Sequence, residues 1–205
     1  MNIKQKKHAD PILAQARRDQ VLTAAEDCFA RRGYHGAGMA EISKTAGMSA
    51  GHIYNYFASK EAIIEAIIAK DMEELFSIFD QLEAAEGELV QVMLDSANEG
   101  VLKHLDAGRN ALQLEMLAEA ARNDKFALLL KQKDDIARAR MRDILTSERS
   151  LIKDISPAEM DSRIGIIFTL FSGISIRRLL EPDLTAEQVL LAMKPALRAM
   201  LLPFA

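Results

Sequence analysis

The sequence predicts an all-α protein. Apolar residues recur at helical spacing almost throughout the 205 residues, and no stretch alternates with a period of two between hairpin turn signals. Apolar residues make up 49% of the chain and charged residues 27%, which is typical of a globular protein with a core of its own. Helix start and stop signals divide the chain into nine helices.

The first four helices form a separate group. A helix is expected over about 13–32, ended by Gly33, and two short helices over about 39–45 and 50–56. Ser59 is placed to cap a longer helix that begins at Lys60.

Five more helices are expected beyond Gly87, and the last two have the best start signals. Ser156 precedes a proline and has a glutamate three positions later, and Thr185 forms a capping box with Gln188. Pro195 is expected to kink the last helix or to loosen the turn around Leu191. The predicted ranges are about 88–105, 110–122, 124–146, 157–180 and 186–202.

Charge is distributed unevenly along the chain. Residues 1–60 hold nine Lys and Arg against five Asp and Glu, whereas the remainder holds 17 against 25. Because a basic segment attracts polyanions and an acidic one repels them, we expect the two parts to face different partners.

Other bulk features exclude several classes of protein. No apolar run approaches the roughly 18 residues of a membrane span, and the basic N-terminus is not followed by the apolar region of a signal peptide. We therefore expect a cytoplasmic protein with no membrane partner. Cys28, the single cysteine, lies at an apolar helical position and is expected to pack rather than react.

The stretch GMSAG around Ser49 fits the G-x-S-x-G pattern of hydrolase nucleophiles. That chemistry needs a buried strand before the serine, but the preceding segment is a short amphipathic helix, and apart from adjacent His52 the only later histidine is His104. We therefore predict that Ser49 caps the next helix, and we expect no catalytic residue.

Two short helices separated by a glycine turn at Gly47 predict a helix-turn-helix. In the second helix, Ile53 and Phe57 would pack inward. The other side offers hydrogen-bonding groups and aromatic rings but no acid, and its residues are Gly51, His52, Asn55 and Tyr56.

Lys60 has two readings. A lysine in the first helical turn opposes the helix macrodipole, so it is either a solvated side chain tolerated at small cost or part of a phosphate site. Lys4, Lys6 and Lys7 likewise fit a DNA-contacting arm or a frayed terminus.

From 33 to 63, the chain closely resembles the DNA-binding domain of the TetR/AcrR family of bacterial transcription repressors. The resemblance covers the first third of the chain, and the nine-helix pattern agrees with the family fold. It implies a DNA-binding domain over 1–60, including an arm over 1–10, and a ligand-binding and dimerisation domain over 61–205. The matching residues are Gly33, Tyr34, Ile42, Ala46, Gly47, Ser49, Gly51, Ile53, Tyr54, Tyr56, Phe57, Ser59, Lys60 and Glu61.

The resemblance also implies roles for these residues. It implies phosphate contacts from Tyr56 and Lys60, often with Tyr54 or Ser49, and an approach to bases by Ala50, Gly51 and His52; Asn55 joins this set from the helix pattern alone. The family's usual hydroxyl pair is replaced by Ala37 and Gly38, so a contact there would have to come from backbone N–H groups.

This resemblance implies a homodimeric repressor that binds a palindromic operator in double-stranded DNA. A small-molecule inducer is expected to release the repressor from this operator. The alternative is a DNA-binding protein of the same fold that is regulated by a protein partner. An enzyme has no support, since zinc-protease, C-x-x-C, phosphate-loop and strand-supported dinucleotide motifs are missing, and no cofactor or metal is predicted.

Two further sets belong to the C-terminal two thirds. A four-helix bundle between two copies is predicted from the apolar last two helices, whose residues could equally be core: Ile164, Ile167, Phe168, Phe171, Val189, Met193, Leu197 and Met200. A pocket is predicted at Met72, Phe76, Met93, Asn98, His104, Glu115, Met116 and Glu119. Methionines at this spacing are usually core, and the two glutamates could instead pair with Arg122 or lie in solvent.

Overall fold

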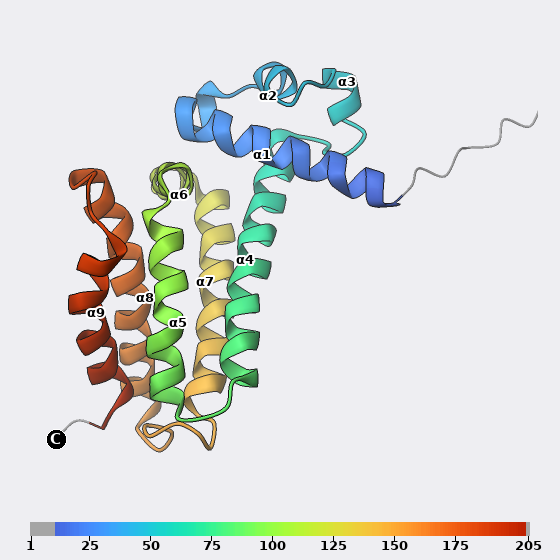
Figure 1. Ribbon diagram of the computed structural model, residues 1–205. Coiled ribbons are helices and arrows are strands. Elements are labelled where there is room, and N and C mark those ends of the chain that lie inside the picture. The colour runs from blue at the N-terminus through green and yellow to red at the C-terminus, as the bar shows by residue number, and fades with distance from the viewer. Residues whose placement is uncertain (1–10, 204–205) are drawn as a thin grey trace, which may run out of the picture. The chain divides into compact units, whose positions relative to one another are not determined.

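The structure is a computed structural model that describes residues 11–203. Within that range it consists of helices and contains no strand, which confirms the predicted all-α class (Figure 1). The nine helices are α1 (Pro11–Gly36), α2 (Met39–Thr45), α3 (Ala50–Ile53), α4 (Lys60–Ala84), α5 (Leu89–Leu105), α6 (Ala107–Ala120), α7 (Asp124–Leu145), α8 (Pro157–Leu180) and α9 (Ala186–Leu201).

Helix ends follow the local signals closely, with informative exceptions. Gly33 breaks the helical geometry as expected, with φ 72° and ψ 167°, but another helical turn follows before α1 ends at Gly36. The structure shortens α3 to four residues and starts α6 earlier than predicted. The early start has a clear cause, because the Asp106 carboxylate accepts a hydrogen bond from the Arg109 N–H and caps the helix.

The predicted caps of the other helices are confirmed. Ser49, Ser156 and the Thr185–Gln188 capping box all accept backbone N–H groups at their helix starts. Pro195 lies inside α9, which is continuously helical from Ala186 to Leu201.

The chain forms two compact units, which we call the first unit, up to Ile67, and the second unit, from Ile68 onward. The first unit contains α1, α2, α3 and the first turns of α4. Burial of each large apolar side chain stabilises such a core by about 1.5–3 kcal/mol. Cys28 is fully buried, as predicted for a packing residue. The core side chains include Val21, Ala25, Cys28, Phe29, Ile42, Ile53 and Ile63.

The second unit is a bundle in which α5 packs against α8 and α9, and α6 packs against α7 and α8. Its main core cluster is formed by α4, α5, α7, α8 and α9, which bury their apolar stripes against one another. The end of α9 is fixed by a buried cation. The Arg163 guanidinium, paired with Glu159 at 2.7 Å, donates to the main-chain carbonyls of Met200 and Leu202.

Candidate functional site

The Ser49 hydroxyl is occupied as a helix cap. Its oxygen accepts a hydrogen bond from the His52 backbone N–H at 3.2 Å. The His52 imidazole contacts the Tyr56 hydroxyl instead, with Nε2 and the hydroxyl oxygen 3.3 Å apart. No nucleophile–base pair therefore forms at this serine, as the sequence context predicts.

The turn between α2 and α3 depends on a glycine. Gly47 has φ 62°, a left-handed conformation that strains other residues, and its N–H donates to the Lys44 carbonyl at 3.2 Å. Ile42 on α2 and its C-cap residue Ala46 pack inward, together with Ile53 and Phe57 after the turn. The helix-turn-helix geometry is thus fixed by one apolar interface and one tight turn.

The remaining side chains of residues 49–57, which we call the recognition segment, lie on the outside. Gly51, His52, Tyr54 and Asn55 are exposed, and Ala50 and Tyr56 are half-buried. The sequence from 42 to 60 contains no Asp or Glu, so this face can approach a polyanion without like-charge repulsion. A Cβ built on Gly51 would meet no atom within 4 Å, so nothing in the described chain requires glycine there.

Lys60 lies close to a main-chain acceptor at the end of α1. Its ammonium donates to the Tyr34 carbonyl at 2.7 Å and lies 4.1 Å from the centroid of the Tyr34 ring. Tyr34 in turn donates its hydroxyl to Glu61, which lowers the pKa of that carboxyl after larger contributions from the Glu61 backbone N–H and Ser59. Because an ammonium has three donors, Lys60 can hold Tyr34 and still bind a phosphate.

Two other regions were considered for DNA contacts, the Ala37–Gly38 pair and the lysines of the N-terminal arm. The Ala37 N–H donates to the Gly33 carbonyl at 3.2 Å and Ala37 is fully buried, whereas Gly38 is exposed, so of this pair only Gly38 is open to a backbone contact with DNA. Lys4, Lys6 and Lys7 lie outside the described residues.

Sequence reasoning missed two α1 side chains that contact this segment. Arg18 donates to the Tyr56 carbonyl at 2.9 Å, and Gln20 donates to the Ala46 carbonyl at 2.7 Å. Their acceptors are main-chain groups 38 and 26 residues away, which no local pattern indicates. The sequence offered one signal for these contacts. Arg18 and Gln20 are polar residues that lie immediately before the apolar stripe that begins at Val21.

The structure divides the predicted pocket residues between different surroundings. Phe76 and Met93 join the main core cluster, whereas Met72 and Met116 are buried outside it. Asn98 is exposed on α5 and lines a surface groove with α9, so it does not lie with the buried members of the set.

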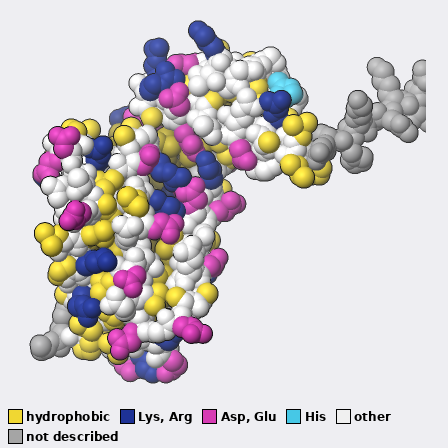
Figure 2. All heavy atoms as spheres, in the orientation of Figure 1, with side chains coloured by type: hydrophobic (Ala, Val, Ile, Leu, Met, Phe, Trp, Pro, Cys, Tyr) yellow, Lys and Arg dark blue, Asp and Glu magenta, His cyan; other side chains and the backbone are white. Residues whose placement is uncertain are grey.

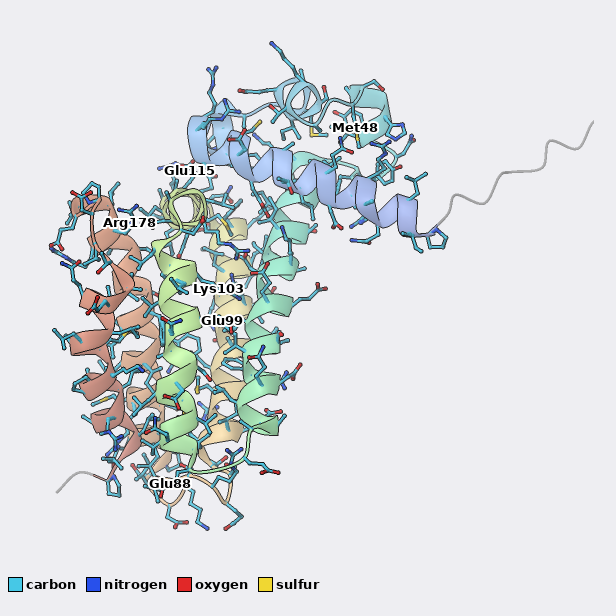
Figure 3. All side chains as sticks on the ribbon, viewed as in Figure 1. Met48, Glu88, Glu99, Lys103, Glu115 and Arg178 are labelled. Carbon is cyan, nitrogen blue, oxygen red and sulfur yellow. The ribbon has the colours of Figure 1, made fainter. Side chains whose placement is uncertain are left out.

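The polar residues of the predicted pocket each have different neighbours. The His104 ring lies beside Phe171, with centroids 6.0 Å apart, and burial lowers its pKa. Glu119 is buried, and its carboxylate accepts from Asn123 at 2.9 Å and lies 3.5 Å from Arg122, as in the ion-pair alternative. Glu115, on α6, is half-buried (Figure 3).

Half of the predicted dimer residues are buried within a single chain. Ile164, Ile167, Met193 and Leu197 are at most 5% exposed, so they cannot form an open face and that part of the prediction is corrected. Phe171 packs on Gly100, where a Cβ would come within 2.6 Å of its ring. Phe168, Val189 and Met200 are partly buried against the same core.

The exposed apolar side chains of α8 and α9 lie elsewhere on these helices, and hydrophobic side chains are visible along the α9 edge in Figure 2. The error has a physical cause, because both helices are apolar on more than one side and the spacing does not say which side their own chain covers. The exposed residues are Ile166, Ile176, Leu179, Leu180 and Leu191.

A buried polar contact between α6 and α8 was also missed. The Asn110 amide donates to the Ser175 carbonyl at 2.9 Å, and the Ser175 hydroxyl donates to Gln113 at 3.0 Å. In the described part of the chain, the buried Asn110 Oδ1 has no hydrogen-bond donor.

Among the described residues, no group of His, Cys, Asp and Glu side chains is arranged to hold a metal ion. None of the described helices is both long and apolar enough to cross a membrane.

Comparison with known proteins gives a consistent result. Residues 21–67 match the family model of bacterial regulatory proteins, tetR family. The HTH-type transcriptional regulator UidR of Escherichia coli K12 is 37% identical over 161 residues, which are 76% of this chain and 79% of that protein. The HTH-type transcriptional repressor AcnR of Corynebacterium diphtheriae is 35% identical over 79 residues, 38% of this chain and 39% of that protein.

Similarity extends to the whole fold. The structure of Salmonella enterica GusR superimposes with a TM-score of 0.75 at 28% identity, covering 96% of this chain and 97% of that one. Both of the curated relatives named above are HTH-type transcriptional regulators, in agreement with the expectation of a DNA-binding regulator. The chain belongs to the TetR family of bacterial regulatory proteins, and it is a DNA-binding transcriptional regulator.

Proposed function

We propose that this protein is a homodimeric, sequence-specific transcriptional repressor whose operator binding is relieved by a small molecule bound in the second unit. The observation that carries the proposal is the recognition segment. Its inner side is fixed by buried apolar residues, while its outer side presents His52, Asn55 and Tyr56 within a stretch, 42–60, that contains no Asp or Glu. A donor-bearing, acid-free face on the second helix of a helix-turn-helix suits the major groove.

Within this face the proposed roles differ. His52 and Asn55 read base edges, and the small residues Ala50 and Gly51 let the backbone come close. Tyr54, Tyr56, Ser49 and Lys60 contact phosphates, which fixes the register without reading sequence.

The test compares two kinds of substitution on a set of duplexes. Lys60→Met should weaken binding to every duplex and reduce the salt slope by about one phosphate contact, because counterion release follows the number of neutralised phosphates. His52→Ala should change the order of preference among duplexes instead. The control is Lys125→Met, an exposed lysine of α7 in the second unit. Equal losses on all duplexes for His52→Ala would refute its base-reading role.

The proposed dimer uses α9. Glu187, Leu191 and Lys194 line a groove of about 450 Å³ beside α5, and Leu191 is 81% exposed. These residues recur at helical spacing, so they share one face. Antiparallel packing of two copies about a two-fold axis near Leu191 would place each Glu187 against the partner's Lys194, the self-complementarity that a two-fold interface requires.

The proposed ligand site lies at the α6–α8 contact. A buried acceptor without a donor, such as Asn110 Oδ1, costs about 1–3 kcal/mol, and a ligand hydroxyl or amide N–H would remove that cost. The accompanying Gln113 and Ser175 make this a neutral, hydrogen-bonding site. Compounds that release operator DNA from the wild type should lose their effect on Asn110→Leu; an unchanged effect would contradict this location.

Ligand and DNA would be coupled through α4. In the second unit, Glu74 of α4 accepts two hydrogen bonds from Arg109 of α6, at 2.6 and 2.9 Å, and lies 3.5 Å from Lys103 of α5. Lys103 also lies 3.8 Å from Glu99 on the same helix (Figure 3). A ligand that binds more tightly when α6 is placed differently would shift α4. The loss of operator affinity would be limited by the difference between the ligand's affinities for the two conformations.

A further inference from the structure

Two α1 side chains hold the carbonyl groups on either side of α3. Gln20 donates to the carbonyl of Ala46, the C-cap residue of α2, and Arg18 donates to the carbonyl of Tyr56, in the turn that follows α3. Carbonyl groups at the ends of helices lack intrahelical donors and carry partial negative charge, so both bonds are favourable.

Each of these donors is itself held in place. The Arg18 guanidinium lies 4.5 Å from the centroid of the buried Phe57 ring, a cation–π geometry. Arg17 donates to the Gln20 side-chain oxygen at 2.7 Å, which directs the Gln20 nitrogen toward the Ala46 carbonyl. Arg18 is therefore held against a buried ring, and Gln20, although exposed, is oriented by its bond to Arg17.

The segment that they hold has little stability of its own. The helix α3 has only four residues, and a helix of one turn is far too short to be stable without tertiary contacts. The inward packing of Ile53 fixes its depth, and the bonds to Ala46 and Tyr56 fix the chain before and after it. Sequence reading needs groups held within a fraction of an ångström, so these bonds bear on specificity.

We propose that Arg18 and Gln20 are positioning residues that set the sequence specificity of the recognition segment while touching no base themselves. This inference rests on the proposed function, because it requires a preferred operator. A direct phosphate contact is the alternative for Arg18. Gln20, however, is neutral and makes the equivalent bond to a main-chain carbonyl at the end of α2, so what the two residues share is a main-chain acceptor.

The test uses a duplex enriched by the wild-type protein and a scrambled duplex of the same composition. Affinity for both is measured against salt concentration for Arg18→Met, Arg18→Lys and Gln20→Met, with the melting temperature recorded for each. The control is Arg31→Met, an exposed α1 arginine paired with Asp27. Arg18→Met keeps a flexible chain over Phe57 but loses the donor, and Arg18→Lys keeps a donor and the charge.

We expect Arg18→Met and Gln20→Met to lower the operator-to-scrambled affinity ratio about tenfold with an unchanged salt slope, and Arg18→Lys to restore part of the ratio. An equal loss on both duplexes, with a slope reduced by about one contact, would identify Arg18 as a phosphate ligand and overturn the proposal. A retained ratio with only a lower melting temperature would also overturn it. If Arg18→Met does not fold, Gln20→Met decides. No preference in the wild type would refute the proposed function, and the positioning role with it.

Discussion

At the scale of single residues, the chemistry of a side chain here depends on the backbone beside it. The Ser49 hydroxyl lies in a hydrolase-like pattern, but its nearest donor is the His52 backbone N–H, so it stabilises a helix start. Gly47 and Gly51, the two glycines of that pattern, serve different purposes. Gly47 has a positive φ that the turn requires, whereas Gly51 lies within α3 with open space around it.

This difference gives a prediction. Gly51→Ala should leave the free energy of unfolding unchanged or raise it by up to about 1 kcal/mol, because alanine is the better helix former and its Cβ meets nothing. The same substitution should weaken operator binding, since in the proposed function it adds a methyl group where the backbone comes close to DNA. Chemical denaturation and operator titration measure the two effects.

The matched control is Gly47→Ala, which should destabilise the fold by about 1 kcal/mol because φ is 62° there. Wild-type operator affinity in Gly51→Ala would show that this position does not closely approach the DNA.

At the scale of helices, the sequence predicts where a helix begins better than it predicts which face of the helix is buried. Ser156 and Thr185 are caps because their hydroxyls bond to nearby N–H groups, and such local chemistry is visible in sequence. Ile164 and Met193 were assigned to a dimer face, yet they are core, because burial depends on helices distant in the chain. The Arg18 and Gln20 contacts were missed because their acceptors are also distant in the chain. Those acceptors are main-chain carbonyl groups, which every residue possesses, so no residue type marks them in the sequence.

The α4 contacts in the second unit give a prediction with a pH dependence. Hydrogen bonds from Arg109 are the main cause that lowers the Glu74 pKa from its usual 4.5. A carboxyl whose pKa is lower in the folded state stabilises the protein above its unfolded pKa, and this contribution is lost as pH falls through the folded pKa. Glu74→Gln should therefore melt below the wild type at pH 7, and the difference should shrink as pH falls from about 5 to about 3.

Glu73→Gln is the matched control, because Glu73 is the adjacent exposed glutamate. It should melt like the wild type across this range. A melting difference for Glu74→Gln that does not change with pH would contradict a stabilising role of the ionised carboxylate.

At the scale of the whole molecule, the proposed function depends on two copies. The proposed two-fold dimer would present two recognition segments to DNA, so its operator should be a rough palindrome. The proposed dimer contact can be tested by charge reversal. Glu187→Lys alone and Lys194→Glu alone should each weaken self-association, because each places like charges across the two-fold axis.

An equimolar mixture of the two single variants should form heterodimers, and the double variant Glu187→Lys/Lys194→Glu should recover the homodimer. Native mass spectrometry measures all four samples. Undisturbed homodimers of both single variants would show that this α9 face is not the contact.

The central claim is that the recognition segment of a dimer reads a specific operator, and selection of bound duplexes from a random pool tests it most directly. Purified protein at about 0.15 M salt, where nonspecific phosphate binding is weakened, should enrich an inverted repeat. The two halves should be separated by about one helical turn of DNA or more. No enriched sequence from protein shown to be folded and dimeric would contradict the account.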